Sequence, residues 1–228
     1  MKQNIYILTA ALATLGLASC ERNNGTNPTD TSTEYHQSYT VIYDKNNKTT
    51  EAVVMFRTNN KSGAIHTLVG NESININREL VGISADRKYY YSSNKFTNVE
   101  FVFTKNAGEQ FLNTIRITDT SDAEFPSVFP SSINKNSGMV VDWDGKPVDD
   151  ATEKMFLVVD DGVHTPVPRQ YNNGQFIFTS GDLTNLTPGD VTIRLERFKY
   201  MPLQQADDSV SGGERVVMVR KSRTISLL

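Results

Sequence analysis

Closely spaced carboxylates are the side chains that come nearest to a recognisable ligand-binding motif. Four of them fall within nine residues: Asp142, Asp144, Asp149 and Asp150. An EF-hand calcium loop needs D-x-D/N-x-D/N-G with a glutamate six residues after the glycine. With Gly145 as that glycine, valine and alanine occupy the first and last ligand positions. We therefore favour a strand end and a turn, expect no bound metal or other cofactor, and keep Asp142, Asp144 and Asp149 as candidates for a calcium site of another geometry.

Histidine and serine show no catalytic pattern. His36, His66 and His164 are far apart, and no pair has the spacing of a helical or hairpin metal site, so we interpret them as surface residues. There is no G-x-S-x-G nucleophile elbow and no glycine-rich phosphate loop ahead of a helix. Two carboxylates across a cleft would suffice for a glycosidase, but no motif selects a pair among 26 acidic residues. We expect a protein that is not an enzyme and has no catalytic residue.

Aromatic residues offer one further kind of binding chemistry, because exposed rings stack on sugars. Tyr89, Tyr90 and Tyr91 are consecutive, and Trp143 is the only tryptophan. In a strand, Tyr89 and Tyr91 share one face while Tyr90 lies on the other, so at least one ring could reach solvent. We favour a strand with two buried rings and one exposed ring. The four aromatic residues remain candidates for glycan stacking.

The charge balance restricts the class of partner. There are 23 basic and 26 acidic residues and a net charge of −3, which gives no general attraction for phosphate backbones. A nucleic-acid partner is therefore not expected. Four basic residues near the C-terminus lie along one expected strand, where we expect them to form a solvated, edge-protecting face: Arg215, Arg220, Lys221 and Arg223.

The N-terminus has the order of a secretory signal, in which a positive region precedes an apolar one. Lys2 precedes Ile5–Ala18, a stretch of fourteen uncharged residues, whereas a membrane-spanning helix needs about 20. The segment Leu17–Cys20 reads LASC and resembles the lipobox of bacterial lipoproteins. The resemblance implies that Cys20 takes a diacylglyceryl group, that the signal peptide (residues 1–19) is removed, and that the new amino group is acylated. A plain signal peptide with a chance cysteine is the alternative.

Cys20 is the only cysteine, so the folded part has no disulfide and no multi-cysteine metal site. Residues 20–36 contain the expected lipidated cysteine and a polar run with almost nothing to bury, which is typical of a flexible tether. The lipid anchor would hold the protein at a membrane of the bacterial cell envelope, and we expect the outer membrane. Whether it faces the periplasm or the cell surface stays open.

The remainder reads as short β-strands separated by clusters of Asn, Gly, Asp and Ser, with no convincing helical period over ten residues. Only a single helical turn is expected, at 181–186. Strands are expected at 38–43, 51–58, 64–69, 73–77, 88–92, 98–104, 110–118, 138–143, 154–160, 175–179, 190–198 and 214–226. A proline-containing segment at 125–133 interrupts the pattern, and each half has about the size of an immunoglobulin-type sandwich. The sequence predicts an all-β fold with two tandem immunoglobulin-like antiparallel β-sandwich domains, at residues 37–128 and 129–228.

Two further resemblances follow from segments of the second half. Residues 181–189 (GDLTNLTPG) are similar to the Leu-x-Pro-Gly corner of fibronectin type III and other immunoglobulin-like domains, although the usual tyrosine is missing. The lipobox, the tether, FPSSINKNSG, VDWDG and LTNLTPGDVTIRLERFK together resemble uncharacterised lipoproteins of Bacteroidetes. That resemblance covers nearly the whole chain and brings no catalytic residue with it.

These features predict a membrane-anchored envelope lipoprotein that is a non-catalytic binding or structural module for a protein or a glycan. The alternative is a carbohydrate-binding or carbohydrate-active accessory protein of a glycan-uptake system, using Trp143 and the tyrosine cluster. The oligomeric state and the identity of the partner stay open.

Overall fold

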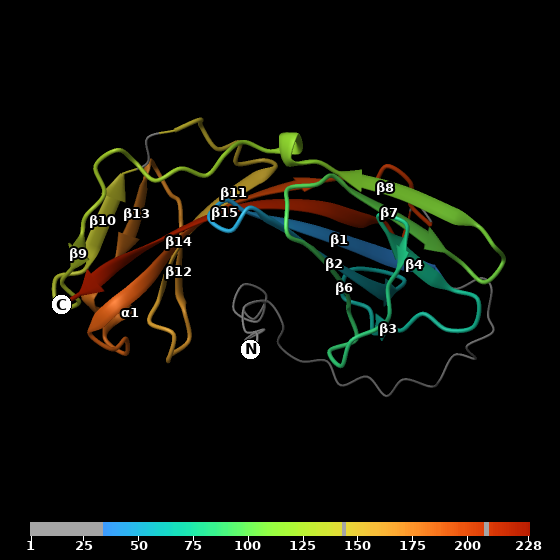
Figure 1. Ribbon diagram of the computed structural model, residues 1–228, viewed down its shortest axis with the longest axis horizontal. Helices are drawn as coiled ribbons and strands as arrows, with labels where there is room; N and C mark the ends of the chain where they lie inside the picture. The colour runs from blue at the N-terminus through green and yellow to red at the C-terminus, as the bar shows by residue number, and fades with distance from the viewer. Residues whose placement is uncertain (1–33, 143–144, 208–209) are drawn as a thin grey trace.

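The computed structural model describes residues 34–142, 145–207 and 210–228. The chain is mostly β-strand, with sheets in a sandwich-like arrangement (Figure 1), which confirms the all-β prediction. The number of immunoglobulin-like domains stays a prediction. None of the described helices is long and apolar enough to cross a membrane.

A nine-stranded main sheet runs through the whole molecule. Its strand order is β12-β11-β14-β15-β1-β2-β3, and β6 also pairs with β2 and β9 with β15. The bounds are Tyr35–Asp44 (β1), Thr49–Thr58 (β2), Ile65–His66 (β3), Tyr89–Ser93 (β6), Ser132–Ile133 (β9), Glu153–Asp160 (β11), Val167–Gln170 (β12), Gly189–Met201 (β14) and Gly213–Leu227 (β15).

The C-terminal strand β15 joins the two halves of the sequence. It pairs antiparallel with β14 along its length and parallel with β1, from Gln37 opposite Gly213 to Asp44 opposite Arg220. Strand pairing in the main sheet therefore crosses the predicted domain boundary at residue 128. That division into domains stays a prediction.

Two smaller sheets pack against opposite ends of the main sheet (Figure 1). One has the order β5-β4-β7-β8, and the other is a pair, β10-β13. The bounds are Ser73–Ile76 (β4), Glu79–Leu80 (β5), Val99–Thr104 (β7), Gln110–Ile115 (β8), Met139–Asp142 (β10) and Gln175–Phe178 (β13), with short helices at Ile117–Asp119 (η1) and Ser180–Leu183 (α1).

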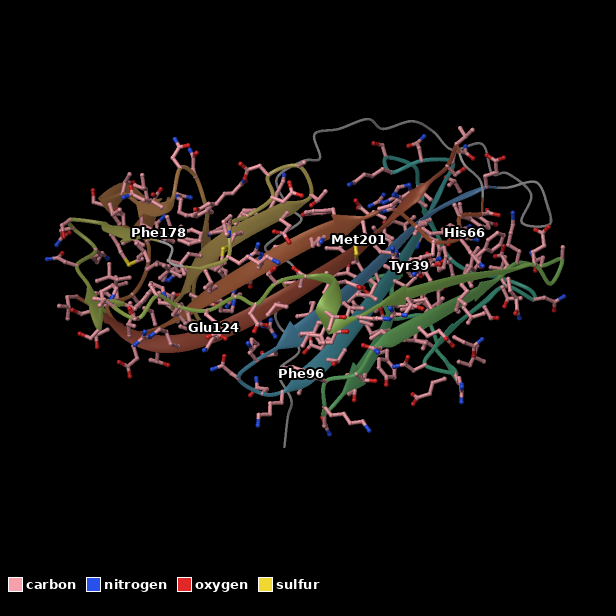
Figure 2. The ribbon with its side chains drawn as sticks, turned by 90° about the horizontal axis from the view of Figure 1, so that it is seen from above. Tyr39, His66, Phe96, Glu124, Phe178 and Met201 are labelled. Carbon is pink, nitrogen blue, oxygen red and sulfur yellow. The ribbon has the colours of Figure 1, made fainter. Side chains whose placement is uncertain are left out.

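One hydrophobic cluster connects both small sheets to the main sheet. Tyr39 of β1 lies 4.7 Å from Phe101 of β7 between ring centroids, and Phe178 of β13 is buried at the other end (Figure 2). Val99, Phe101 and Phe103 are fully buried while their neighbours in β7 are partly exposed. The period of two in the sequence of this strand thus corresponds to one buried face and one partly exposed face.

Several strand predictions need correction, either in the length of the strand or in its position within the sheet. The predicted strand at 64–69 contains only the two-residue β3. The sequence does not predict β5 and β9, which have two residues each, or β12, which contains Pro168. The prediction that the basic residues of β15 form a solvated edge face is wrong, because β15 lies between β14 and β1 in the sheet interior. Arg220 is accordingly buried, whereas Arg223 is exposed.

Candidate functional site

The candidate calcium residues do not form a site among the residues that the structure describes. Asp142 ends β10, and Asp144 lies outside the described residues together with Trp143. The Asp149 carboxylate accepts hydrogen bonds from the Ala151 N–H (3.1 Å) and the Thr152 hydroxyl (2.8 Å), which is the geometry of a turn cap. In the described ranges, no group of three His, Cys, Asp or Glu residues could hold a metal ion.

The tyrosine cluster presents one ring to solvent, as its alternation in β6 predicts. Tyr89 is buried and accepts a hydrogen bond from the Leu68 N–H (2.9 Å), and Tyr91 is partly buried against the core. Tyr90 is 40% exposed, and its hydroxyl donates to Asp86 (2.5 Å). Burial and this hydrogen bond raise the pKa of Tyr90 to about 12. A single exposed ring leaves stacking on a sugar open only for Tyr90.

The predicted surface position of the histidines is wrong for His36. His36 is buried in β1 because that strand lies between β15 and β2, and its Nδ1 is 2.8 Å from the Ser211 carbonyl oxygen. His66 stacks on Tyr35 and contacts Glu72, whereas His164 is largely exposed. Cys20, the predicted lipidation site, lies outside the described residues.

A row of alternating charges crosses the face of the main sheet that is turned away from the core. We call this face the outer face. Asp44 of β1 is opposite Arg220 of β15, which is opposite Glu196 of β14. Side chains alternate along each strand, and the neighbouring residues Tyr43, Val219 and Leu195 belong to the core. The charged row therefore points away from the core.

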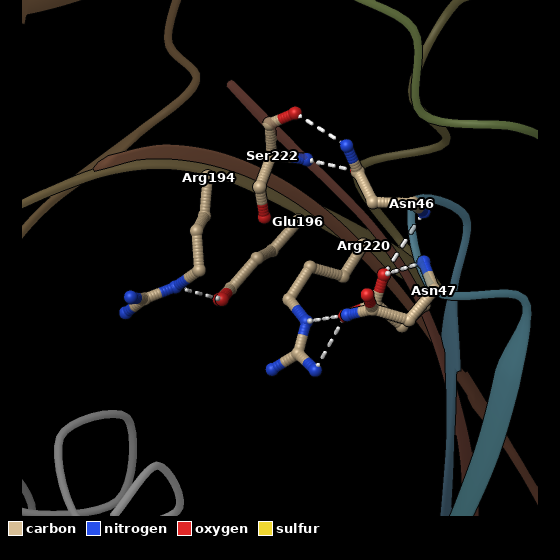
Figure 3. A network of polar contacts seen from close by, with 7 residues as sticks. Asn46, Asn47, Arg194, Glu196, Arg220 and Ser222 are labelled. Atoms are coloured by element: carbon tan, nitrogen blue, oxygen red, sulfur yellow. Dashed lines mark hydrogen bonds and ion pairs between the residues drawn. The ribbon is translucent and has the colours of Figure 1, made fainter. Parts of the chain in front are cut away.

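Ion pairs hold the row together (Figure 3). The Asp44 carboxylate accepts hydrogen bonds from Arg220 Nε (3.2 Å) and Nη2 (2.9 Å). Arg194 Nη1 contacts Asp160 of β11 (2.5 Å), and Arg194 Nε contacts Glu196 (3.3 Å). Arg194 is 9% exposed and Arg220 is 5% exposed, so both guanidinium groups are held at the sheet surface by carboxylates rather than extending into solvent.

The turn after β1 is tied to the same row. Asp44 accepts hydrogen bonds from the backbone N–H groups of Asn46 (2.9 Å) and Asn47 (3.1 Å). The Asn46 side-chain amide accepts from the Ser222 N–H (2.6 Å) and donates to the Ser222 carbonyl oxygen (2.8 Å). It thereby bonds to β15 as a neighbouring strand would, and it fixes the β1–β2 turn beside the row (Figure 3).

The pKa values of the two carboxylates next to Arg220 shift in opposite directions, although burial raises both. Burial raises the pKa of the Asp44 carboxyl, but the Asn47 N–H and the Arg220 charge outweigh it and bring the pKa below the ordinary 3.8. At Glu196, burial raises the pKa above its ordinary value, although the charges of Arg194 and Arg220 oppose this shift. Asp44 is therefore the ionised partner that holds Arg220.

A concave groove of about 520 Å³ lies over this part of the outer face. Strands β14 and β15, the start of β2 and the turn after β11 contribute residues to it. It is lined by Asp44, Asn47, Thr49, Glu51, Asp160, Asp161, Gly162, Asp190, Thr192, Arg194, Arg220 and Ser222. Five carboxylates, two guanidinium groups and several hydroxyl or amide groups thus face one hollow.

The carboxylates of the groove differ in their pairing. Asp44 and Asp160 bind the two arginines. Asp161 accepts hydrogen bonds from the N–H groups of Thr187 (2.8 Å) and His164 (2.8 Å); burial alone raises its pKa, but these bonds hold the pKa well below the usual range. Glu51 and Asp190 make no ion pair or side-chain hydrogen bond with any described residue. These two charges are available to a ligand.

Sequence reasoning missed this groove. Thr192, Arg194 and Glu196 alternate with buried residues and suggest a wet strand face, and nothing local indicates that Asp44 lies against Arg220, 176 residues away. The only sequence signal was the pair of opposite charges at Arg194 and Glu196, two residues apart on one strand face.

Comparisons with known proteins do not supply a function. A scan of protein-family models found no match for this chain, and a search of curated proteins found none either.

Proposed function

We propose that this protein is a non-catalytic binding module, lipid-anchored through Cys20 at the bacterial cell envelope, which binds a glycan in the groove of the outer face. The observation that carries the proposal is the pair of arginines, Arg194 and Arg220, held by carboxylates at the floor of a groove of about 520 Å³. The groove position replaces the predicted tyrosine and tryptophan cluster as the site that we would test first.

Sugar hydroxyls both donate and accept hydrogen bonds, and the groove supplies both kinds of partner. Carboxylates accept, guanidinium groups donate, and the Asn47 amide and the Thr49 and Thr192 hydroxyls can do either. Ion pairs fix the two arginines before a ligand arrives, so less side-chain freedom is lost on binding. These properties favour an oligosaccharide over a compact apolar ligand.

A glycan array probed with residues 21–228 tests the proposal. We expect one class of oligosaccharide to bind and to be recovered intact after incubation. Arg194→Lys keeps the charge but loses the planar fork of donors, so binding should weaken about tenfold, which is about 1.4 kcal/mol. Arg116→Lys, the same change at an exposed residue away from the groove, is the control. An array without any bound glycan would refute the proposal, and cleaved products would refute the non-catalytic role.

A protein ligand is the second candidate, because the outer face also has apolar residues. Phe156 and Phe198 form an edge-to-face pair with centroids 5.7 Å apart on the neighbouring strands β11 and β14. This candidate is favoured if no glycan binds in the array and the anchored protein can be cross-linked to another protein in cells.

Anchoring has its own test. Cys20→Ser should abolish incorporation of radioactive palmitate and release the protein from the membrane fraction, because the thiol is the expected acyl acceptor. Substitution of the neighbouring Ser19 by alanine leaves the thiol in place and serves as the control. Palmitate incorporation that persists in Cys20→Ser would show that the lipobox assignment is wrong.

A further inference from the structure

We infer that the groove selects glycans without acidic groups, and that Glu51 and Asp190 determine this selectivity. The inference rests on the proposed function, since it names the class of glycan that the same groove would accept. It depends on how the charges of the groove are paired rather than on how many there are.

The arginines of the groove are already neutralised. Arg220 is bound to Asp44 through two nitrogens, and Arg194 contacts both Asp160 and Glu196. An incoming carboxylate or sulfate would compete with carboxylates that belong to the protein and cannot leave. The guanidinium groups therefore suit neutral hydroxyl oxygens better than a further anion.

Glu51 and Asp190 add negative charge that no cation of the described chain balances. Glu51 is half-buried on β2, and Asp190 is exposed at the beginning of β14. Three strand-to-strand spacings, about 14 Å in total, separate β2 from β14. Asp190 also lies eight residues along β14 from Phe198, which is level with Glu51 in the sheet register, so the two carboxylates lie toward opposite ends of the groove. An acidic sugar bound over the arginines would lie between them and be repelled by both.

Asp161, in the turn after β11, adds negative charge to the same groove. Its side chain is only 2% exposed, and the hydrogen bonds from backbone N–H groups that hold its pKa low keep it ionised at neutral pH. Because Asp161 is already saturated with hydrogen bonds, it contributes charge to the groove without offering a free acceptor to a ligand. Glu51 and Asp190 are therefore the residues that can be changed without removing a structural contact.

The experiment compares oligosaccharides in matched pairs, in which one hexose of the neutral compound is replaced by the corresponding hexuronate. Binding to residues 21–228 is measured by calorimetry for the neutral oligosaccharides found on the array and for their acidic counterparts. We expect each neutral compound to bind at least about tenfold more tightly than its counterpart at low salt. In about 1 M salt, where the Debye length is near 3 Å, that ratio should fall.

The double variant Glu51→Gln/Asp190→Asn should reduce the ratio to about threefold or less, mainly by improving binding of the acidic compounds. Glu79→Gln/Glu109→Gln removes two exposed charges away from the groove and is the matched control for net charge. An acidic glycan as the tightest ligand, or a groove variant that behaves like the control, would overturn the inference and leave the proposed function standing. Failure of every glycan to bind would overturn both.

Discussion

Arg197 shows at the scale of a single residue how this fold accommodates a charge inside its core. It is fully buried on the core face of β14, and its Nη2 contacts Glu153 of β11 (2.5 Å). Its guanidinium group also donates to the carbonyl oxygens of Lys146 (2.9 Å) and Pro147 (2.8 Å). The side chain thereby fixes the loop before β11 to the sheet that supports the groove from the other side.

Arg197→Met should destabilise the protein by about 3 to 5 kcal/mol, because Glu153 would remain buried without its partner. The double variant Arg197→Met/Glu153→Met removes both charges and should recover part of that loss. Urea unfolding followed by circular dichroism measures the free energy of unfolding of each variant. A double variant no more stable than Arg197→Met would show that the unpaired carboxylate is not the cause.

Asp44 should make stability depend on pH. Its folded-state pKa lies below the ordinary 3.8, so its contribution is present above that value and is lost as the pH falls through the folded-state pKa. Asp44→Asn should therefore cost about 2 kcal/mol near pH 7 and less at about pH 2, where more of the carboxyl is protonated. Asp150→Asn, at an exposed carboxylate, is the control for unfolding experiments at both pH values. An equal cost at both would contradict the role of the ionised carboxylate.

At the scale of elements, the pairing of β15 with β1 requires the two backbones to approach closely at Gly213, the first residue of β15. Gly213 has φ of +154°, and a Cβ placed there would lie 2.3 Å from the Gln37 carbonyl oxygen. Gly213 is also the first residue of β15 to pair with β1. Only glycine allows the parallel pairing to begin at this position.

Gly213→Ala should destabilise the protein by roughly 2 to 4 kcal/mol, since the clash involves backbone that cannot move without disturbing the β1–β15 register. Gly82→Ala is the matched control, because nothing lies within 4 Å of a Cβ at that position. Thermal unfolding and amide exchange of β1 would report the change. Similar melting temperatures for the two variants would refute the close approach.

At the scale of the whole molecule, the main sheet makes the two halves of the chain depend on each other. β1 belongs to the first half, and its partner β15 is the last strand. The core cluster also includes residues from both small sheets. The sandwich-like arrangement is thus completed only when the C-terminal strand is in place.

Residues 34–128 expressed alone should not fold, because β1 would lose the eight residue pairs that it forms with β15 and would expose an unprotected edge. The complete folded segment, residues 34–228, should unfold in a single transition. Nuclear magnetic resonance of the fragment and calorimetry of the complete segment are the measurements. A well-dispersed spectrum from residues 34–128 would support the two independent domains that the sequence predicts.

Much of the fold was predictable because strands have a local signal. Val99, Phe101 and Phe103 occur at the period of two that buries one face of a strand, and the structure buries all three. Val191 and Leu195 follow the same period in β14, and both are buried in the core. The same period suggests that Arg194 is exposed to solvent, but Arg194 is buried by its contacts with Asp160 and Glu196. Alternation assigns a residue to one face of a strand, but it does not reveal which side chains from other strands cover that face.

The sequence by itself determined the all-β class, the position of most strands and the alternation of Tyr89 to Tyr91, because these depend on neighbouring residues along the chain. Only the tertiary structure decided that β15 lies between β14 and β1, and that Asp44 meets Arg220. Strand order and register between distant segments depend on the packing of the entire core, for which no local pattern exists. The groove is a product of that packing, since its carboxylates and arginines come from five strands and the turn after β11, which are brought together only in the folded sheet.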